Sequence, residues 1–192
     1  MGRAVRAAHS GGEGRAVRFL PTQLDGACVI ELDRLEDERG FFARSFCRDE
    51  FAAHGLEPGF VQCNISFNAR RGTLRGLHYQ ANPYEEAKLV RCTRGAIFDV
   101  IVDIRKRSDT YRRWIGVELT AENRRMLYVP KGFAHGFQTL EDASEVFYQM
   151  SDMFRPESAR GARWSDPAFG IAWPLEDPIV SPRDAGYPDF IS

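Results

Sequence analysis

The sequence predicts an all-β fold, either a sandwich or a jelly-roll barrel, with a few short helices and an irregular C-terminal tail. Short runs of alternating polar and apolar residues recur at spacings of roughly ten residues, with Gly, Pro, Asn and Asp between them. Patterns of amphipathic helices are almost absent. The predicted strands cover residues 27–32, 60–67, 72–79, 88–93, 96–104, 114–119, 125–129, 133–140 and 144–151.

Within the 96–104 run, Phe98, Val100 and Val102 share one face, and Ile97 and Ile101 share the other. We expect a short helix at 48–54 and a single turn at 120–123. The tail after residue 155 is rich in proline, which favours irregular structure.

The length and composition bound the remaining possibilities. A chain of 192 residues with 43% hydrophobic residues can bury the core of one domain. We expect that domain at 17–192, after a flexible leader at 1–16. The net charge of −1 gives no reason to expect binding to nucleic acid or to a membrane surface. No apolar run reaches the about 20 residues of a membrane span, and four scattered cysteines suggest reduced thiols and a cytoplasmic protein.

The stretch Arg75-Gly76-Leu77-His78 contains the most informative histidine. Strict alternation places Arg75 and His78 on opposite faces, unless a bulge or twist near Gly76 re-aims one of them. No second histidine follows two residues later, so the His-x-His pair of a metal site is missing. His78 is therefore either a hydrogen-bonded core histidine or a group that transfers protons in a barrel cavity.

A second motif, Pro130-x-Gly132-x-x-His135, resembles the second half of the cupin signature. In metal-binding cupins the first half supplies two histidines and a glutamate, whereas here it offers only His78. We therefore predict no metal site. His135 is then a polar wall residue or a hydrogen-bond donor to a substrate oxygen.

Three other side chains have both a structural and a chemical interpretation. Tyr148 alternates with apolar neighbours, so it either packs in the core or donates a proton to a carbanion. Lys88 and Arg39 are either solvated surface charges or part of an anion site. Arg39 precedes Gly-Phe-Phe, which favours a cation held by aromatic packing, as a diphosphate site requires.

Taken together, these motifs resemble the dTDP-4-dehydrorhamnose 3,5-epimerase family. The resemblance extends over roughly residues 20–184, almost the whole of the predicted domain. The matching segments are 38–42, Gln62-x-Asn64-x-Ser66, 72–80, 88–91, 95–105, 130–137, Trp164-x-Asp166-Pro167, Ile171-x-Trp173-Pro174 and Ser181-x-Arg183-Asp184.

The resemblance implies a cupin jelly-roll homodimer without metal or organic cofactor. Its substrate would be a thymidine-diphosphate-linked 4-keto-6-deoxyhexose, on the path to rhamnose. The family's roles fall on His78 as general base, Asp184 as its supporting carboxylate, Tyr148 as acid and Lys88 as the cation that stabilises the enolate. Its substrate contacts fall on Arg75 and His135 for the sugar and on Arg39, Gln62 and Asn64 for the nucleotide diphosphate.

The chemistry of a keto sugar agrees with these roles. A ketone at C4 acidifies the protons at C3 and C5, and a cation near O4 lowers the energy of the enolate. Inversion requires that the proton returns from the face opposite the base. A histidine and a tyrosine on two sides of the sugar satisfy this requirement.

Three positions depart from the family pattern. Arg44 stands where a glutamate is usual, Gln149 replaces a lysine, and Phe154 replaces a tyrosine. These departures leave open the exact sugar nucleotide and whether C3, C5 or both are inverted. The alternatives are therefore a mono-epimerase, a cupin that binds nucleotide sugars without turnover, or a metal dioxygenase.

We also expect dimerisation through the N-terminal segment that carries Gly40-Phe41-Phe42, because such segments commonly cover the sheet edge of a neighbour.

Overall fold

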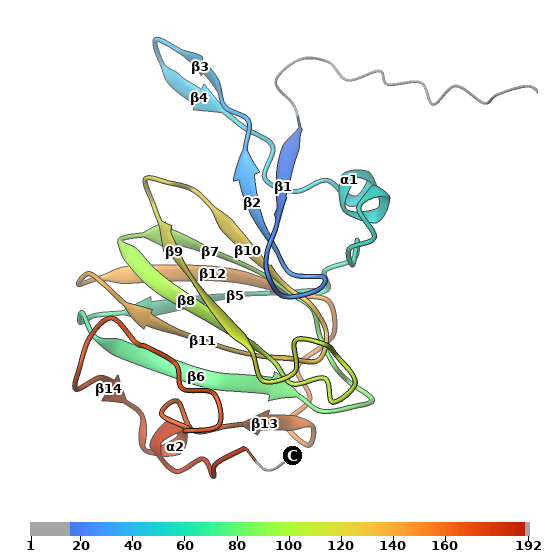
Figure 1. Cartoon of the computed structure of the whole chain (residues 1–192). Helices are drawn as coiled ribbons and strands as arrows, with labels where there is room; N and C mark the ends of the chain where they lie inside the picture. The colour runs from blue at the N-terminus through green and yellow to red at the C-terminus, as the bar shows by residue number, and fades with distance from the viewer. Residues whose placement is uncertain (1–15, 191–192) are drawn as a thin grey trace, which may run out of the picture.

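Two antiparallel sheets of six and five strands, the second extended by a short parallel strand, face each other in the computed structural model, which describes residues 16–190 (Figure 1). The first sheet has the order β1 (Val17–Pro21), β2 (Cys28–Leu32), β10 (Met126–Val129), β7 (Lys88–Arg94), β12 (Ser144–Met150) and β5 (Gln62–Asn68). The second has the order β13 (Ala159–Gly161), β6 (Thr73–Gln80), β11 (Phe133–Thr139), β8 (Ala96–Asp103) and β9 (Trp114–Thr120), and β14 (Ile179–Val180) pairs with β6.

The main hydrophobic core lies between these two sheets. Val90 of β7, Leu127 of β10 and Val146 of β12 point inward from the first sheet, against Ile101 and Phe133 of the second. On β8, alternate residues divide between this core and the opposite face of the sheet, as the sequence pattern predicts. The strand periodicity therefore places both apolar faces of β8 against neighbouring layers.

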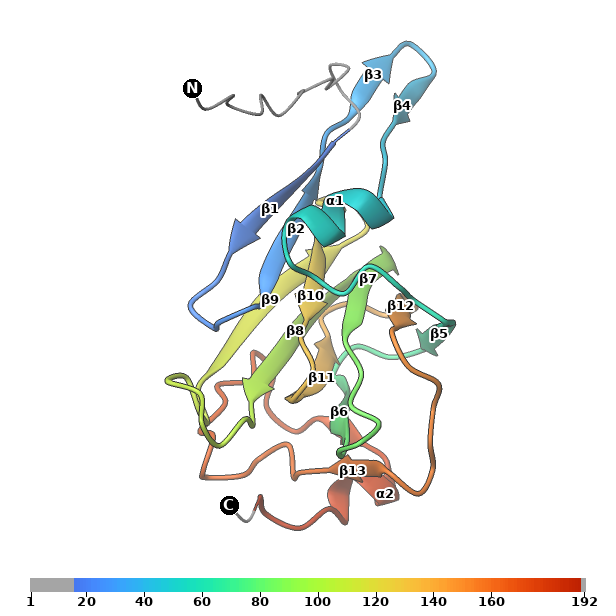
Figure 2. The same ribbon diagram turned by 90° about the vertical axis from the view of Figure 1, so that its right-hand side faces the viewer.

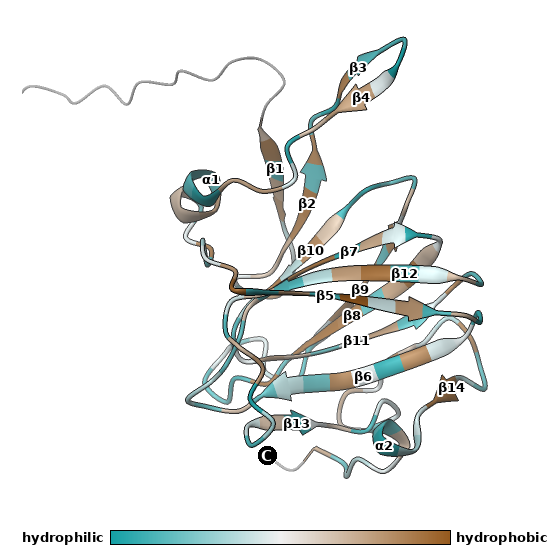
Figure 3. Ribbon diagram, turned by 180° about the vertical axis from the view of Figure 1, so that it is seen from behind, coloured by the Kyte–Doolittle hydropathy of each residue, from teal (hydrophilic) through white to brown (hydrophobic). Residues whose placement is uncertain are grey.

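The N-terminal part of the chain packs on the outside of the first sheet. Helix α1 (Arg48–Ala53) buries Phe51 completely, against Leu89 and Tyr128. Strands β3 (Leu35–Asp37) and β4 (Gly40–Phe42) form a hairpin that projects away from the barrel (Figure 2). Colouring by hydropathy shows hydrophobic residues on β4, and all three residues of this strand are exposed (Figure 3).

The C-terminal tail covers the outer face of the second sheet. Phe169 and Ala162 of the tail are buried against Leu77, Val100 and other residues of that face. Strands β13 and β14 both pair with β6, and helix α2 (Pro182–Ala185) follows β14. The tail is thus less irregular than the sequence suggests, and it fixes α2 beside β6.

Most of the predicted elements are present. Each predicted strand coincides with an observed one to within two residues, and the helix at 48–54 is observed as α1. Residues 121–123 form a turn, where the sequence predicted a single turn at 120–123. The sequence did not predict β1, the β3–β4 hairpin, β13, β14 or α2. Of the predicted leader, all but Ala16 lies outside the described residues. Among those residues, no helix has the length and apolar character that a membrane crossing requires.

Candidate active site

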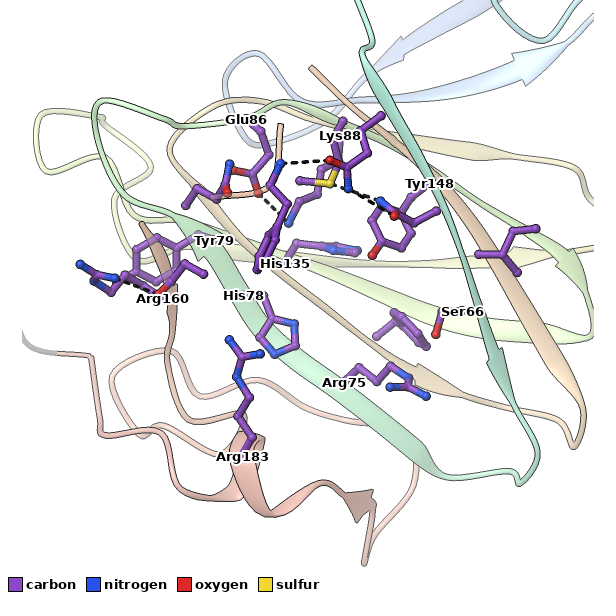
Figure 4. Close-up of a pocket in the computed structure, with 18 of the residues that line it drawn as sticks. Ser66, Arg75, His78, Tyr79, Glu86, Lys88, His135, Tyr148, Arg160 and Arg183 are labelled. Carbon is purple, nitrogen blue, oxygen red and sulfur yellow. Dashed lines mark hydrogen bonds and ion pairs between the residues drawn. The ribbon is translucent and has the colours of Figure 1, made fainter. Parts of the chain in front are cut away.

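A cavity of about 630 Å³ opens between the two sheets, where the inward face of the barrel changes from apolar to polar side chains (Figure 4). Strands β5, β7 and β12 line it from one side, and β6 and β11 line it from the other. Eight of the nine site residues expected from the sequence are in or next to it. These are His78, Tyr148, Lys88, Gln62, Asn64, Arg75 and His135, which line the cavity, and Asp184, which contacts His78.

A β-bulge in β6 brings His78 and Arg75 to the same cavity. His78 pairs with His135 of β11 and Arg75 pairs with Phe137, so two residues of β6 lie opposite the single residue Gly136. The strict alternation assumed for this strand is therefore wrong, and the irregularity near Gly76 is present. Gly76 has a φ of 131°, and a Cβ there would lie 2.6 Å from the Cα of Gly136. Only glycine fits this position.

His78 is paired with a carboxylate from the tail. Its Nε2 lies 2.8 Å from Oδ1 of Asp184, and the side chain of Asp184 is only 6% exposed. Oδ2 of Asp184 accepts a second hydrogen bond from the backbone N–H of Gly76 (3.3 Å). The hydroxyl of Ser181, the N-cap of α2, accepts a hydrogen bond from the backbone N–H of Asp184. This bond fixes Asp184 in the first turn of the helix.

The environment of Asp184 favours its ionised form. Burial alone would raise its pKa, but the hydrogen bond from His78, the positive charge of His78 in its protonated form, the Gly76 N–H and the charge of Arg183 outweigh burial and lower it. A carboxylate that accepts from Nε2 leaves Nδ1 of His78 with its lone pair, and Nδ1 has no hydrogen-bond partner among the described residues. This arrangement suits a base that takes up a proton and becomes an imidazolium.

Tyr148 faces this pair from the opposite sheet. It lies on the inward face of β12 with Val146 and Met150, as the alternation predicts. Burial raises the pKa of its phenol; the charge of Arg75 lowers it and the charge of Glu86 raises it, with a net increase. The hydroxyl is therefore protonated near neutral pH and can donate a proton.

Lys88 begins β7 and points into the cavity beside Glu86. Its Nζ lies 3.1 Å from Oε1 of Glu86, and the two side chains are 9% and 3% exposed. Lys88 is thus a buried cation with a carboxylate partner, not a solvated surface charge.

Polar side chains from neighbouring strands hold the other cavity residues. Arg75 donates from Nε to Oδ1 of the buried Asn68 (2.7 Å). On β5, the side chain of Gln62 donates to that of Asn64 (3.3 Å) and accepts from the backbone of Phe154 (3.0 Å). The inward positions of β5 therefore present amide groups to the cavity.

His135 belongs to a second imidazole–carboxylate pair. Its Nε2 lies 2.8 Å from Oδ1 of Asp99 on the adjacent strand β8, and Asp99 is fully buried. His135 lines the cavity, so it is a polar wall residue. Among the described residues, no group of three or more His, Cys, Asp or Glu side chains could hold a metal ion.

Arg39 is the expected site residue that the structure keeps away from the cavity of its own chain. It lies at the β3–β4 turn with a side chain 84% exposed, and it forms an ion pair with Asp37. The ring of Phe41 instead contacts the guanidinium groups of Arg34 and Arg124. The aromatic packing expected for Arg39 is therefore absent from this hairpin.

The three departures from the family pattern have different surroundings. Arg44 pairs with Glu50 of α1 (2.6 Å), so its charge is neutralised at some remove from the cavity. Gln149 does not line the cavity, whereas Phe154 does. Of the three, only Phe154 changes the surface that a ligand would contact.

Sequence reasoning missed several residues of this site. Asn68 is hydrogen-bonded to Arg75, and Asp99 is hydrogen-bonded to His135. Arg160 and Arg183 line the cavity from the C-terminal tail. Glu86 was missed although it lies two residues before Lys88, a spacing that places both on the same face of an extended chain. That spacing was the available signal.

Comparison with known proteins gives a consistent result. The family model for dTDP-4-dehydrorhamnose 3,5-epimerase matches residues 21–191. The epimerase of Methanothermobacter thermautotrophicus is 49% identical over 173 residues, which cover 88% of this chain and 92% of the relative. The crystal structure of the Bacillus anthracis enzyme with TDP and PPi bound is 40% identical, with a TM-score of 0.88, and the match covers 91% of this chain and all of that one. The Legionella pneumophila enzyme in complex with dTDP-4-keto-L-rhamnose is also 40% identical, with a TM-score of 0.85 and coverage of 91% and 93%. The chain therefore belongs to the dTDP-4-dehydrorhamnose 3,5-epimerase family of isomerases.

Proposed function

We propose that this protein epimerises a dTDP-4-keto-6-deoxyhexose at C3 and C5 by proton transfer through an enolate. His78 is the base, Tyr148 is the acid and Lys88 stabilises the enolate oxygen. The observation that carries the proposal is the arrangement of the cavity. The carboxylate-backed His78 lies on one sheet, and Tyr148 and Lys88 lie on the sheet that faces it.

The first step is removal of a proton next to the ketone by Nδ1 of His78. The electron pair of the C–H bond moves into the new C=C bond, and the carbonyl electrons move onto O4. The charge of Asp184 stabilises the imidazolium that forms. Because the ketone already acidifies both neighbouring carbons, this step needs neither a metal nor an organic cofactor.

The second step returns a proton from the other face. Lys88 places a positive charge against the negative charge that develops on O4, where removal of such a stabilising group typically costs about 3–4 kcal/mol in barrier height. Tyr148 then protonates the carbanionic carbon from the sheet opposite His78, which inverts the centre. The raised pKa of Tyr148 keeps this proton in place until the enolate forms.

The remaining cavity residues supply contacts for the nucleotide diphosphate and the sugar. Arg75, Gln62 and Asn64 present a guanidinium and two amides, and His135 presents an imidazole held by Asp99. The Bacillus anthracis relative binds TDP and PPi, which agrees with a diphosphate ligand. Arginine is the residue best suited to phosphate oxygens.

A homodimer is part of the proposal. The β3–β4 hairpin projects from the barrel with Phe42 64% exposed (Figure 3). The exposed aromatic side chains of such a hairpin are stabilised when they pack on a second copy. Arg39 contributes to diphosphate binding only if the hairpin reaches the cavity of that second copy. Sedimentation equilibrium at micromolar concentration tests this, and a monomeric mass would contradict it. We also expect a cytoplasmic location, since the four cysteines are free thiols.

Deuterium incorporation tests the function directly. The keto sugar nucleotide is incubated with enzyme in heavy water, and deuterium at C3 and C5 of the product is counted by NMR. The proposal expects incorporation at both carbons and its loss in His78→Ala. Incorporation at one carbon would indicate a mono-epimerase. Binding without incorporation would indicate a nucleotide-sugar binding protein, and undiminished incorporation in His78→Ala would exclude His78 as the base.

A further inference from the structure

The charges around the cavity are distributed unevenly. Arg75, Arg160, Arg183 and Lys88 are its cationic lining residues, and Glu86 is the one carboxylate among the described residues that line it. Glu86 and Lys88 lie at one end of the cavity, and Arg75 and Arg183 lie at the other (Figure 4). The carboxylate is therefore confined to the end that holds the lysine.

The three arginines differ from the lysine in their partners. Arg75 donates to the amide oxygen of Asn68, Arg160 to backbone carbonyls, and Arg183 to the hydroxyl of Tyr187. None of these arginines forms an ion pair with a carboxylate among the described residues. Lys88, in contrast, forms an ion pair with Glu86 at 3.1 Å. The guanidinium groups are thus free of ion pairs, although the charge of Arg183 also acts on the buried Asp184, whereas the ammonium of Lys88 is paired with a carboxylate.

The pairing of Glu86 with Lys88 is built into the start of β7. The intervening residue, Ala87, exchanges hydrogen bonds with Ser151: its N–H donates to the hydroxyl (2.8 Å), and its carbonyl accepts from the Ser151 N–H (2.9 Å). The backbone between the two charged residues is therefore fixed. Oε2 of Glu86 is buried and has no hydrogen-bond partner among the described residues. A buried carboxylate oxygen without a partner is costly to stability, so the presence of Glu86 calls for another reason.

A carboxylate in a diphosphate-binding cavity has one clear electrostatic consequence. It repels the diphosphate, whereas a neutral sugar ring with a ketone and hydroxyl groups suffers no such repulsion. Without Glu86, the unpaired ammonium of Lys88 would compete with the arginines for the diphosphate. The ligand would then bind in reversed or mixed orientations, with the ketone away from the lysine.

We propose that Glu86 is a positioning residue that excludes the diphosphate from the Lys88 end of the cavity and so reserves the ammonium for the ketone oxygen of the sugar. This inference rests on the proposed function. The influence of Glu86 extends beyond Lys88, because its charge also contributes to the raised pKa of Tyr148 after the effects of burial and Arg75.

Titration calorimetry with inorganic pyrophosphate tests the inference. Glu86→Gln keeps the shape of the side chain and removes its charge, and we expect it to bind pyrophosphate about tenfold more tightly than the wild type. The matched control is Glu85→Gln, which makes the same change one residue away, outside the cavity lining, and is expected to leave the affinity unchanged. Glu86→Asp retains the charge and should behave like the wild type.

Two further variants keep the inference testable if Glu86→Gln folds poorly. Lys88→Gln should weaken pyrophosphate binding. The double variant Glu86→Gln/Lys88→Gln has no buried charge at this end and should return within about threefold of the wild type. Equal pyrophosphate affinity in Glu86→Gln and wild type, or an equal gain in Glu85→Gln, would overturn the inference.

Turnover supplies a second measurement. Glu86→Gln should have a lower kcat/KM for epimerisation and stronger inhibition by pyrophosphate, while Glu85→Gln changes neither. A merely structural role for Glu86 would lower activity without raising pyrophosphate affinity. Because calorimetry does not require turnover, the role of Glu86 can be judged even if the wild type does not epimerise the keto sugar.

Discussion

Replacing Asp184 by asparagine tests the contribution of its charge to catalysis. The amide oxygen of asparagine can still accept the hydrogen bond from Nε2 of His78, now 2.8 Å from the carboxylate. The Ser181 cap contacts the backbone of residue 184 and is unaffected. The substitution therefore keeps the hydrogen bond to the imidazole and removes the negative charge behind it. It also replaces the oxygen that accepts from the Gly76 N–H with an amide NH2 group.

The size of the effect follows from the geometry. With the imidazolium charge spread over its ring, the two charge centres lie about 4 Å apart, where an effective dielectric constant near 20 gives about 4 kcal/mol. This interaction exists only once His78 has taken up the proton, so it lowers the barrier rather than stabilising the free enzyme and substrate. At about 1.4 kcal/mol for each factor of ten, Asp184→Asn should slow proton transfer about 1000-fold.

The assay is the rate of deuterium exchange at C3 and C5 under saturating substrate. Asp189→Asn is the control, because Asp189 is a half-exposed carboxylate of the same tail that pairs with Arg163 outside the cavity. Thermal unfolding should show that both variants are folded. An exchange rate for Asp184→Asn within tenfold of the wild type would refute the assignment of His78 and Asp184 as base and supporting carboxylate.

Three further substitutions test other parts of the structure. Tyr148→Phe should retain exchange by His78 but lose inverted product by at least about 100-fold, as comparison of exchange with epimerisation by NMR would show. Asp103 has a pKa lowered to about 2, because hydrogen bonds from Arg105, Ser108 and Thr110 outweigh burial. Its contribution of about 2 kcal/mol is present above pH 4 and lost as the pH falls toward 2, so Asp103→Asn should cost about that much at pH 7 and progressively less in acid, measured by urea unfolding. Gly76→Ala should lower both the unfolding temperature and the exchange rate, because its Cβ would collide with Gly136; unchanged values would contradict the close approach of β6 and β11.

The strand positions could be predicted from the sequence because alternation is a local signal. The inward faces of 96–103 and 144–150 follow directly from it, and they correctly place Tyr148 on the cavity side. The order of strands in the sheets could not be predicted, since it depends on pairing between distant segments such as β6 with β13 and β14. The hairpin at 35–42 was missed because it has no core against which an alternating pattern would be maintained.

The site residues also fall into those that local alternation predicts and those that depend on distant segments. Lys88, Tyr148, Gln62 and Asn64 lie on regular strands, where parity fixes the direction of a side chain. The direction of the His78 side chain could not be predicted from alternation, because a single extra residue in β6 inverts the alternation. The partnership with Asp184 spans 106 residues, so it came only from family resemblance and not from any local pattern.

The bulge at Gly76 joins the two features of the site that sequence periodicity could not supply. By inserting one residue opposite Gly136, it turns His78 toward the cavity that Arg75 also lines. The same irregularity leaves the N–H of Gly76 free to donate to Oδ2 of Asp184, whose other oxygen contacts His78. The orientation of the imidazole and the position of its counter-charge therefore depend on one local distortion of β6. That distortion in turn requires glycine, because β11 approaches too closely for any side chain.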